Sequence, residues 1–343
     1  MAHIDRCNFR DYKYIILQCS DEAEYCGGLG DRLKSLPFFI AAAAYNKRIF
    51  LIRWQRPTKL EEFLIPNEIH WSVPDWMYEE LNDFHNHTES IFAGTSRGIT
   101  RFLKDDKLVI EGRLQDFFGG SSYYNWMDSE LDKNKELIEL SGSSTPMGWK
   151  QYQILFHDLF FTLFKPIPPI AKLVEDKMQL ANLVPGNFTA SHYRAFYGTE
   201  NKKHVVTEEI LAQKTRNALN CASFIQPGDP IYFASDSLGA ISFAREIMNE
   251  NNGTNTINRK KIVVFDEAKE ALHIDKSNQW TSGNVSDFYP TFVDLLIMSK
   301  AKCMALGMGG YSLFANFLST NSHCVIQHDH QRKTKAQTCN WTN

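Results

Sequence analysis

The stretch from residue 14 to residue 52 constrains the fold of this chain most. An apolar run, Tyr14–Leu17, precedes the segment Tyr25-Cys26-Gly27-Gly28-Leu29-Gly30-Asp31-Arg32-Leu33, and an alanine-rich run, Leu36–Ala44, follows it. A second apolar run occupies Ile49–Ile52. This order predicts a strand, a glycine turn, a helix and another strand. Glycine amides approach a ligand without a Cβ clash, and a helix N-terminus favours anions. The unit is therefore expected to hold a polar, phosphorylated or sugar-like group.

The second half of the chain alternates between strand and helix patterns. Strands are predicted at Asn187–Tyr193, Ile231–Ala234, Ile262–Phe265 and Met304–Leu306. Helices are predicted at Thr207–Ala222, Leu238–Met248, Phe292–Ser299 and Ser312–Leu318, with Thr207 as an N-cap. This βα alternation predicts a parallel sheet covered on both faces.

A proline-rich segment, Leu163–Ile170, separates these two halves. Its three prolines cannot continue a helix, and they bias the chain towards extended structure. We expect two α/β domains, residues 1–165 and 166–343, with a ligand cleft between them, because such sheets bind ligands beyond the carboxyl ends of their strands.

Charge and hydropathy exclude some functions and leave the compartment open. The net charge of −3 gives no argument for binding nucleic acid or an anionic membrane. No apolar run approaches the ~18 residues that span a bilayer, and residues 1–5 do not resemble a signal peptide. We expect a soluble chain without membrane contact, in the Golgi or endoplasmic reticulum lumen if an anchor is missing from this sequence, and otherwise in the cytoplasm.

Cysteines and asparagines also bear on the compartment. The seven cysteines show no Cys-x-x-Cys spacing, and their odd number leaves at least one free thiol in the monomer. Five Asn-x-Ser/Thr sequons permit glycosylation in a lumen, at Asn86, Asn187, Asn252, Asn284 and Asn340. Chance in an asparagine-rich chain explains them nearly as well. Asn187 is expected in a buried strand, which argues against modification there.

Polar side chains gather where the predicted strands of the second half end. His192, Arg194 and Glu200 follow one strand, Asp236 and Ser237 the next, and Gly307, Gly309, Gly310 and Ser312 the last. Arginine offers a rigid, bidentate fork for phosphate, and a histidine two residues earlier on a strand points the same way. The last turn is suited to an anion nest. A structural salt bridge of Arg194, a core position for His192 and a simple tight turn are the competing interpretations.

Other chemistries find less support. The third glycine of a dinucleotide fingerprint is replaced by Leu33, and Arg53-Trp54 stands where an acid would bind ribose, so only NADP is conceivable. No metal site is predicted, because His323, His328, Asp329 and His330 lack helical spacing, and His328-Asp329-His330 is interpreted as a polar tail. Asp-x-Asp does not occur anywhere in the sequence.

Five motifs, in this order, resemble the GDP-fucose-dependent fucosyltransferase superfamily, which includes nodulation, α1,6- and protein O-fucosyltransferases. They are Gly28-Leu29-Gly30-Asp31 with Arg48–Trp54, His192-Tyr193-Arg194, Tyr232-Phe233-Ala234-Ser235-Asp236, Asp294-Leu295-Leu296-Ile297-Met298-Ser299-Lys300-Ala301 and Gly309-Gly310-Tyr311-Ser312. The resemblance implies a GT-B fold, in which two Rossmann-like domains face each other across a cleft. It also implies inverting, metal-independent transfer of fucose from GDP-fucose to a glycan or protein hydroxyl, with no other cofactor.

The resemblance assigns roles to residues. Arg194 would hold the diphosphate and stabilise the leaving group, while His192 and Asp294 would contact the nucleoside. Gly310 and Ser312 would supply phosphate donors, and the general base would be Glu200, with Asp31 and Asp236 as alternatives. The remaining residues expected at the donor are Gly28, Gly30, Asp31, Asp236 and Gly309.

The sequence departs from the family in two places. Ala195-Phe196-Tyr197 stands where relatives have an acid or a second arginine, and Gly309-Gly310 replaces a serine pair, keeping backbone donors but losing hydroxyls.

The expected domain roles follow from the same resemblance. Residues 1–165 would form the acceptor side and residues 166–343 the donor side. Four residues of the first domain are suited to stacking on sugar rings: Trp54, Trp71, Pro74 and Trp76. For any one of them, a place in the buried core is the commoner explanation. The alternatives are a non-catalytic sugar- or nucleotide-binding module of the same fold and, with less support, an NADP oxidoreductase.

Overall fold

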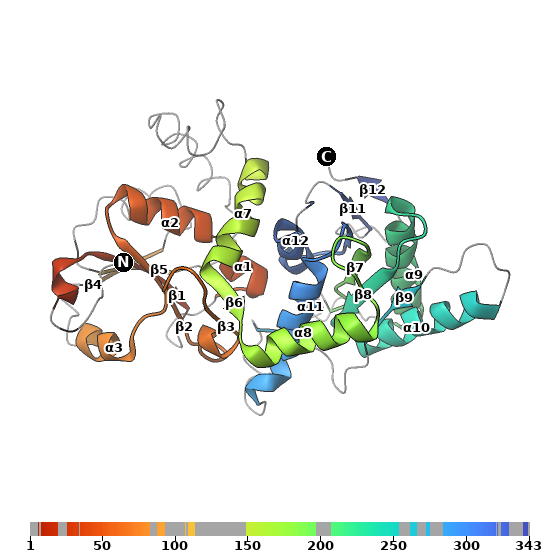
Figure 1. Ribbon diagram of the computed structural model, residues 1–343, viewed down its shortest axis with the longest axis horizontal. Coiled ribbons are helices and arrows are strands. Elements are labelled where there is room, and N and C mark those ends of the chain that lie inside the picture. Colours follow the sequence, from red (N-terminus) through yellow and green to blue (C-terminus); the bar gives the residue numbers. More distant parts are fainter. Residues whose placement is uncertain are drawn as a thin grey trace. The chain divides into compact units, whose positions relative to one another are not determined.

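The structure is a computed structural model that describes residues 6, 8–19, 26–33, 35–82, 88–92, 107, 109–113, 149–196, 207–253, 261–265, 272–274, 284–319, 321, 324–328 and 339–341. Figure 1 colours the chain from red at the N-terminus to blue at the C-terminus. It divides into two compact units, Met1–Ile167 and Pro168–Asn343, which we call unit 1 and unit 2 and describe separately.

Unit 1 is built on a parallel sheet with the strand order β2-β1-β5-β4. The strands are β1 (Tyr14–Cys19), β2 (Ile49–Trp54), β4 (Thr88–Phe92) and β5 (Val109–Arg113). Helix α2 (Leu36–Tyr45) joins β1 to β2 and packs against both, so the predicted strand–turn–helix–strand unit is confirmed. All six residues of β1 are buried, as expected for a strand covered on both faces.

The rest of unit 1 packs around large aromatic side chains. Trp71 is fully buried, donates its indole N–H to the carbonyl oxygen of Leu163 at 2.7 Å, and meets the Phe164 ring edge-on. The remaining elements are η1 (Phe9–Asp11), α1 (Leu29–Leu33), η2 (Leu60–Glu62), β3 (Leu64–Pro66), α3 (Asp75–Asn82), α7 (Trp149–Leu163) and β6 (Phe164–Pro166), which pairs antiparallel with β3.

Unit 2 has a second sheet with the strand order β12-β11-β10-β7-β8-β9. Its strands are β7 (Thr189–Tyr193), β8 (Ile231–Ser235), β9 (Ile262–Val263), β10 (Cys303–Leu306), β11 (Val325–Gln327) and β12 (Asn340–Trp341). All neighbours are parallel except β11 and β12. The helices are α8 (Pro168–Leu180), α9 (Glu208–Ile225), α10 (Leu238–Gly253), η7 (Val285–Phe288), α11 (Tyr289–Met298) and α12 (Gly310–Phe317) (Figure 1). The predicted α/β fold class is confirmed.

Helices cover both faces of the second sheet. Ile231 and Phe233 belong to a buried cluster with residues of α9 and α10, whereas the alternate residue Tyr232 reaches α11 on the other face. The amide of Ile210 donates to Thr207 Oγ1 at 3.3 Å, so Thr207 caps α9 as predicted. The predicted alternation of strands and helices therefore matches the observed one.

The proline-rich segment behaves differently at its two ends. Helix α7 ends at Leu163, and the extended strand β6 follows through Pro166, as expected. Pro168 and Pro169, however, begin α8, because the first turn of a helix has no amide partner to lose and favours the fixed φ of proline.

Three disulfides join six of the seven cysteines. They link Cys19 to Cys26, Cys221 to Cys339 and Cys303 to Cys324. The sequence left this pairing open. No helix among the described residues has both the length and the apolar character needed to span a membrane.

Candidate functional site

The candidate site of unit 2 lies at the carboxyl ends of three adjacent strands. In the sheet β7 lies between β10 and β8, with His192 paired to Leu306 on one side and to Ala234 on the other. The loops that follow these strands carry Arg194, then Asp236, then the glycine turn before α12. Parallel strands place their carboxyl ends on one sheet edge, so the structure brings these sequence-predicted groups together.

His192 is buried and uncharged near neutral pH. Burial lowers the pKa of its imidazole to about 3, although the Asp236 carboxylate opposes this shift. The ring lies 5.1 Å from that of Tyr311, and within the described part of the chain its Nδ1 has no hydrogen-bond partner. Buried polar atoms are nearly always paired, so an unpaired one at a sheet edge calls for an explanation.

His328 supports the His192 backbone. Its Nε2 donates to the carbonyl oxygen of His192 at 2.8 Å, and the side chain is buried at the end of β11. The interpretation of His328 as part of a polar tail is therefore wrong. No local pattern signals this contact, because 136 residues separate the two histidines.

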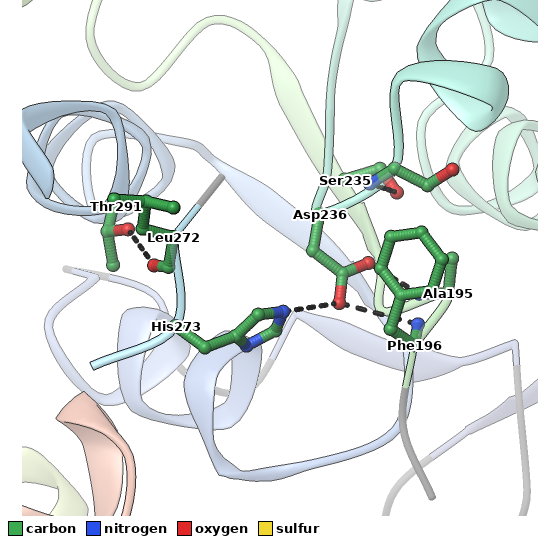
Figure 2. A network of polar contacts seen from close by, with 8 residues as sticks. Ala195, Phe196, Ser235, Asp236, Leu272, His273 and Thr291 are labelled. Atoms are coloured by element: carbon green, nitrogen blue, oxygen red, sulfur yellow. Dashed lines mark hydrogen bonds and ion pairs between the residues drawn. The ribbon is translucent and has the colours of Figure 1, made fainter. Parts of the chain in front are cut away.

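Asp236 anchors the chain immediately after Arg194 (Figure 2). Its Oδ1 accepts from the amide of Ala195 at 2.6 Å, and its Oδ2 accepts from the amide of Phe196 at 3.4 Å. His273 Nε2 lies 3.4 Å from the same Oδ2. Burial raises the pKa of the Asp236 carboxyl, but the contact with His273, the nearby His192 and the hydrogen bond from the Ala195 amide outweigh burial and hold the pKa below its ordinary value. Asp236 is therefore a carboxylate that fixes the backbone flanking Arg194.

Gly307 allows the loop after β10 to approach β7. A Cβ built on it would lie 2.6 Å from the carbonyl oxygen of His192 and 3.4 Å from the amide nitrogen of Arg194. His328 and Asp236 thus hold the backbone of residues 192–196 by hydrogen bonds, and Gly307 approaches the same backbone closely.

We expect Gly307→Ala to destabilise unit 2 by about 1–3 kcal/mol, because its Cβ must displace backbone rather than a flexible side chain. Urea unfolding measures the loss. Gly28→Ala is the matched control, since its nearest contact would be an ordinary 3.8 Å. Equal midpoints for the two variants would show that the loop yields easily.

The turn before α12 has the features of an anion nest. Gly309 adopts φ +91°, a conformation that favours glycine, and Gly310 begins the helix. Ser312, in the first helical turn, is fully buried, and its Oγ has no hydrogen-bond partner within the described residues. A left-handed glycine, the N-terminus of a helix and an unpaired hydroxyl together suit an anionic group.

Asp294 lies on α11 among tyrosines. Tyr232 donates its hydroxyl to Asp294 Oδ1 at 2.6 Å, and Tyr311 donates to the carbonyl oxygen of Thr291. Burial, reinforced by Asp294, raises the pKa of Tyr311 well above its ordinary value, so this phenol remains neutral.

In unit 1 the glycine turn is organised by residues that the sequence did not single out. Gly27 has φ +73°, and its Cβ would lie 2.8 Å from that of Asp31, so this position requires glycine. Gly30 lies inside α1. Arg32 is buried over the Trp54 ring and donates to the carbonyl oxygens of Gly27 and Arg56. Glycine spacing alone drew attention to Gly28 and Gly30 rather than to Gly27.

The aromatics expected to stack on sugars fall into two groups. Trp54 and Trp71 are core residues. Pro74 and Trp76, in contrast, line a largely apolar cavity of about 1110 Å³ within unit 1, together with Tyr12 and Met77.

Several residues that were predicted to be functional or metal-ligating candidates lie in parts of the chain that the structure does not describe. Glu200, the expected general base, lies outside the described residues, as do His323, Asp329 and His330. Among the residues that the structure does describe, no three His, Cys, Asp or Glu side chains gather as a metal site would require.

Comparison with solved structures identifies the fold. The Arabidopsis thaliana fucosyltransferase FUT1, solved as a mutant in complex with GDP, matches 96% of this chain and 74% of its own, with a TM-score of 0.62 and 14% identity. The fucosyltransferase NodZ from Bradyrhizobium matches over 92% of this chain and 95% of its own, with a TM-score of 0.50 and 10% identity. No protein-family model and no curated protein matches the sequence. The resemblance to fucosyltransferases is thus confirmed at the level of fold.

Proposed function

We propose that unit 2 binds GDP-fucose and that the chain transfers the fucose to a hydroxyl group of a glycan or protein. The observation that carries this proposal is the set of groups at the ends of β7, β8 and β10, on a fold shared with two fucosyltransferases. One of these, FUT1, was solved with GDP. In this proposal unit 2 is the donor side and unit 1 the acceptor side.

The diphosphate would lie between Arg194 and the turn before α12. The Arg194 guanidinium is held by a backbone that Asp236 anchors, so its fork requires little reorganisation to bind phosphate. The Gly310 amide and the unpaired Ser312 hydroxyl would donate from the opposite loop. These groups neutralise charge as it develops on the leaving GDP.

The nucleoside would lie between His192 and Asp294. Because His192 is neutral, it contributes hydrogen bonding without charge, and its unpaired Nδ1 gains a partner. Asp294 would accept from the N1–H and N2–H edge of guanine, a pair of donors that adenine and uracil lack. This contact makes Asp294 the residue that determines the choice of nucleotide.

The reaction that follows is a displacement with inversion. The acceptor oxygen forms a bond to C1 of fucose while the bond from C1 to the phosphate oxygen breaks, and GDP leaves with the electron pair. The acceptor proton passes to a general base. Asp236 is poorly suited to this role because two amides and His273 engage its carboxylate, which leaves Glu200 and Asp31 as candidates.

The test uses GDP-fucose with water as the acceptor, because the natural acceptor is not identified. We expect slow release of GDP and fucose that EDTA does not abolish, since arginine and backbone amides supply the positive charge. Activity that EDTA removes and manganese restores would contradict the metal-independent mechanism. GDP-fucose binding without any turnover, in water or with glycan and peptide acceptors, would favour a non-catalytic sugar-nucleotide binding module.

We expect Asp294→Ala to weaken GDP binding by about 1.5–3 kcal/mol, the range for hydrogen bonds to a charged partner. UDP binding should change far less. Tyr232→Phe is the matched control, because it removes only the hydroxyl that contacts Asp294. Calorimetry of the wild type and both variants with GDP and with UDP measures these affinities. Equal losses of GDP affinity in the two variants would mean that Asp294 acts by supporting Tyr232.

A further inference from the structure

The disulfides indicate the kind of cellular compartment in which this chain folds. Their Cα–Cα separations of 5.8, 5.4 and 4.8 Å lie within the range that disulfides allow. Cys221 and Cys339 lie 118 residues apart in the sequence, so only the fold brings this pair together. Structural disulfides form and persist in oxidising compartments and are rare in the reducing cytosol. A chain with three of them is expected to mature in an oxidising lumen.

Asn187, the first residue of a sequon, is exposed. The expectation that it lies in a buried strand is wrong, because β7 begins only at Thr189. Asn187 belongs to the preceding turn, and its backbone N–H donates to the carbonyl oxygen of Val184 at 3.0 Å. A Cβ built on the adjacent Gly186 would meet nothing within 4 Å, so this turn faces open space.

Asn284 is the second exposed asparagine with a sequon. It precedes η7 in extended conformation, with φ −63° and ψ 151°, and its side chain makes no capping hydrogen bond. Ser286, the hydroxyl residue of this sequon, is also exposed. Neither the helix nor the core requires the Asn284 side chain, so it is available for modification.

We propose that this protein carries N-linked glycans at Asn187 and Asn284. These sequons lie entirely within the described residues, begin with an exposed asparagine and occur in a disulfide-bonded chain. The side-chain amide nitrogen forms a bond to C1 of an oligosaccharide carried on a lipid diphosphate. The bond from C1 to the phosphate oxygen breaks, the lipid diphosphate leaves, and the amide loses one proton to a base of the host transferase. This proposal does not depend on the fucosyltransferase activity.

The experiment uses the full chain isolated from the cells that make it. Peptide-N-glycosidase, which converts a glycan-bearing asparagine to aspartate, should produce aspartate at positions 187 and 284 and increase electrophoretic mobility. Asn187→Gln and Asn284→Gln, expressed in the same cells, should each remove one mobility step. Thr189→Ser and Ser286→Thr keep both sequons and should retain every step. Ser286→Ala should reproduce the loss seen in Asn284→Gln.

A thiol assay tests the compartment separately. Alkylation of the denatured, unreduced protein should label only the peptide that contains Cys7, the one cysteine outside the three pairs. Labelling of all seven cysteines would overturn the inferred compartment. Intact disulfides with unmodified Asn187 and Asn284, or with glycans only at other sequons, would overturn the glycan sites.

Discussion

Replacing Arg194 by alanine should lower the rate of GDP release from GDP-fucose by about a hundred- to a thousand-fold. The loss of one charged group that stabilises the leaving diphosphate costs roughly 3–4 kcal/mol in the transition state. Arg194→Lys should recover only part of this rate, because lysine keeps the charge but not the planar fork. The melting curve should stay close to that of the wild type.

The control for this experiment is Arg216→Ala, an exposed arginine on α9. It removes the same charge from unit 2 away from the strand ends and should leave the rate unchanged. If both variants release GDP equally fast, Arg194 has no special role at the diphosphate.

Breaking the Cys221–Cys339 disulfide should produce the largest loss of stability. This bond closes a loop between residues 118 positions apart and attaches β12 to α9, where Cys221 is fully buried. Cross-links across long loops reduce the freedom of the unfolded chain, and their removal typically costs about 2–5 kcal/mol. Cys339→Ala should therefore unfold at a clearly lower urea concentration than the wild type.

Cys7→Ala serves as the control for Cys339→Ala, because Cys7 is the cysteine left outside the three pairs. It should unfold with the wild type. Equal midpoints for Cys339→Ala and Cys7→Ala would mean that the disulfide contributes nothing to the folded state.

The alternation of strands and helices could be predicted because its signals are local. Runs such as Ile231–Ala234 and Leu238–Met248 carry apolar patterns and turn residues that need no tertiary information. Short or atypical elements could not be predicted in this way, because they lack such local signals. β12 has two residues and pairs only through distant contacts, and α8 begins with prolines that were interpreted as a break.

The candidate site could be predicted only in part. The strand order brings Arg194, Asp236 and Gly310 to one edge, and strand ends can be located from sequence. The sequence could not show that Asp236 anchors a backbone segment rather than a ligand, since its partners lie 40 and 41 residues away. His273 and His328 were missed as site residues because neither belongs to a motif, and only the fold brings them close to His192.

Titration calorimetry of the wild-type protein with GDP, UDP, CMP and NADP shows whether unit 2 recognises GDP. We expect GDP to bind far more tightly than the other three nucleotides. We also expect GDP at about 100 times its Kd to stabilise the fold by about 2.7 kcal/mol through mass action. Equal affinities for GDP and UDP, or tight binding of NADP without binding of GDP, would show that unit 2 is not a GDP site.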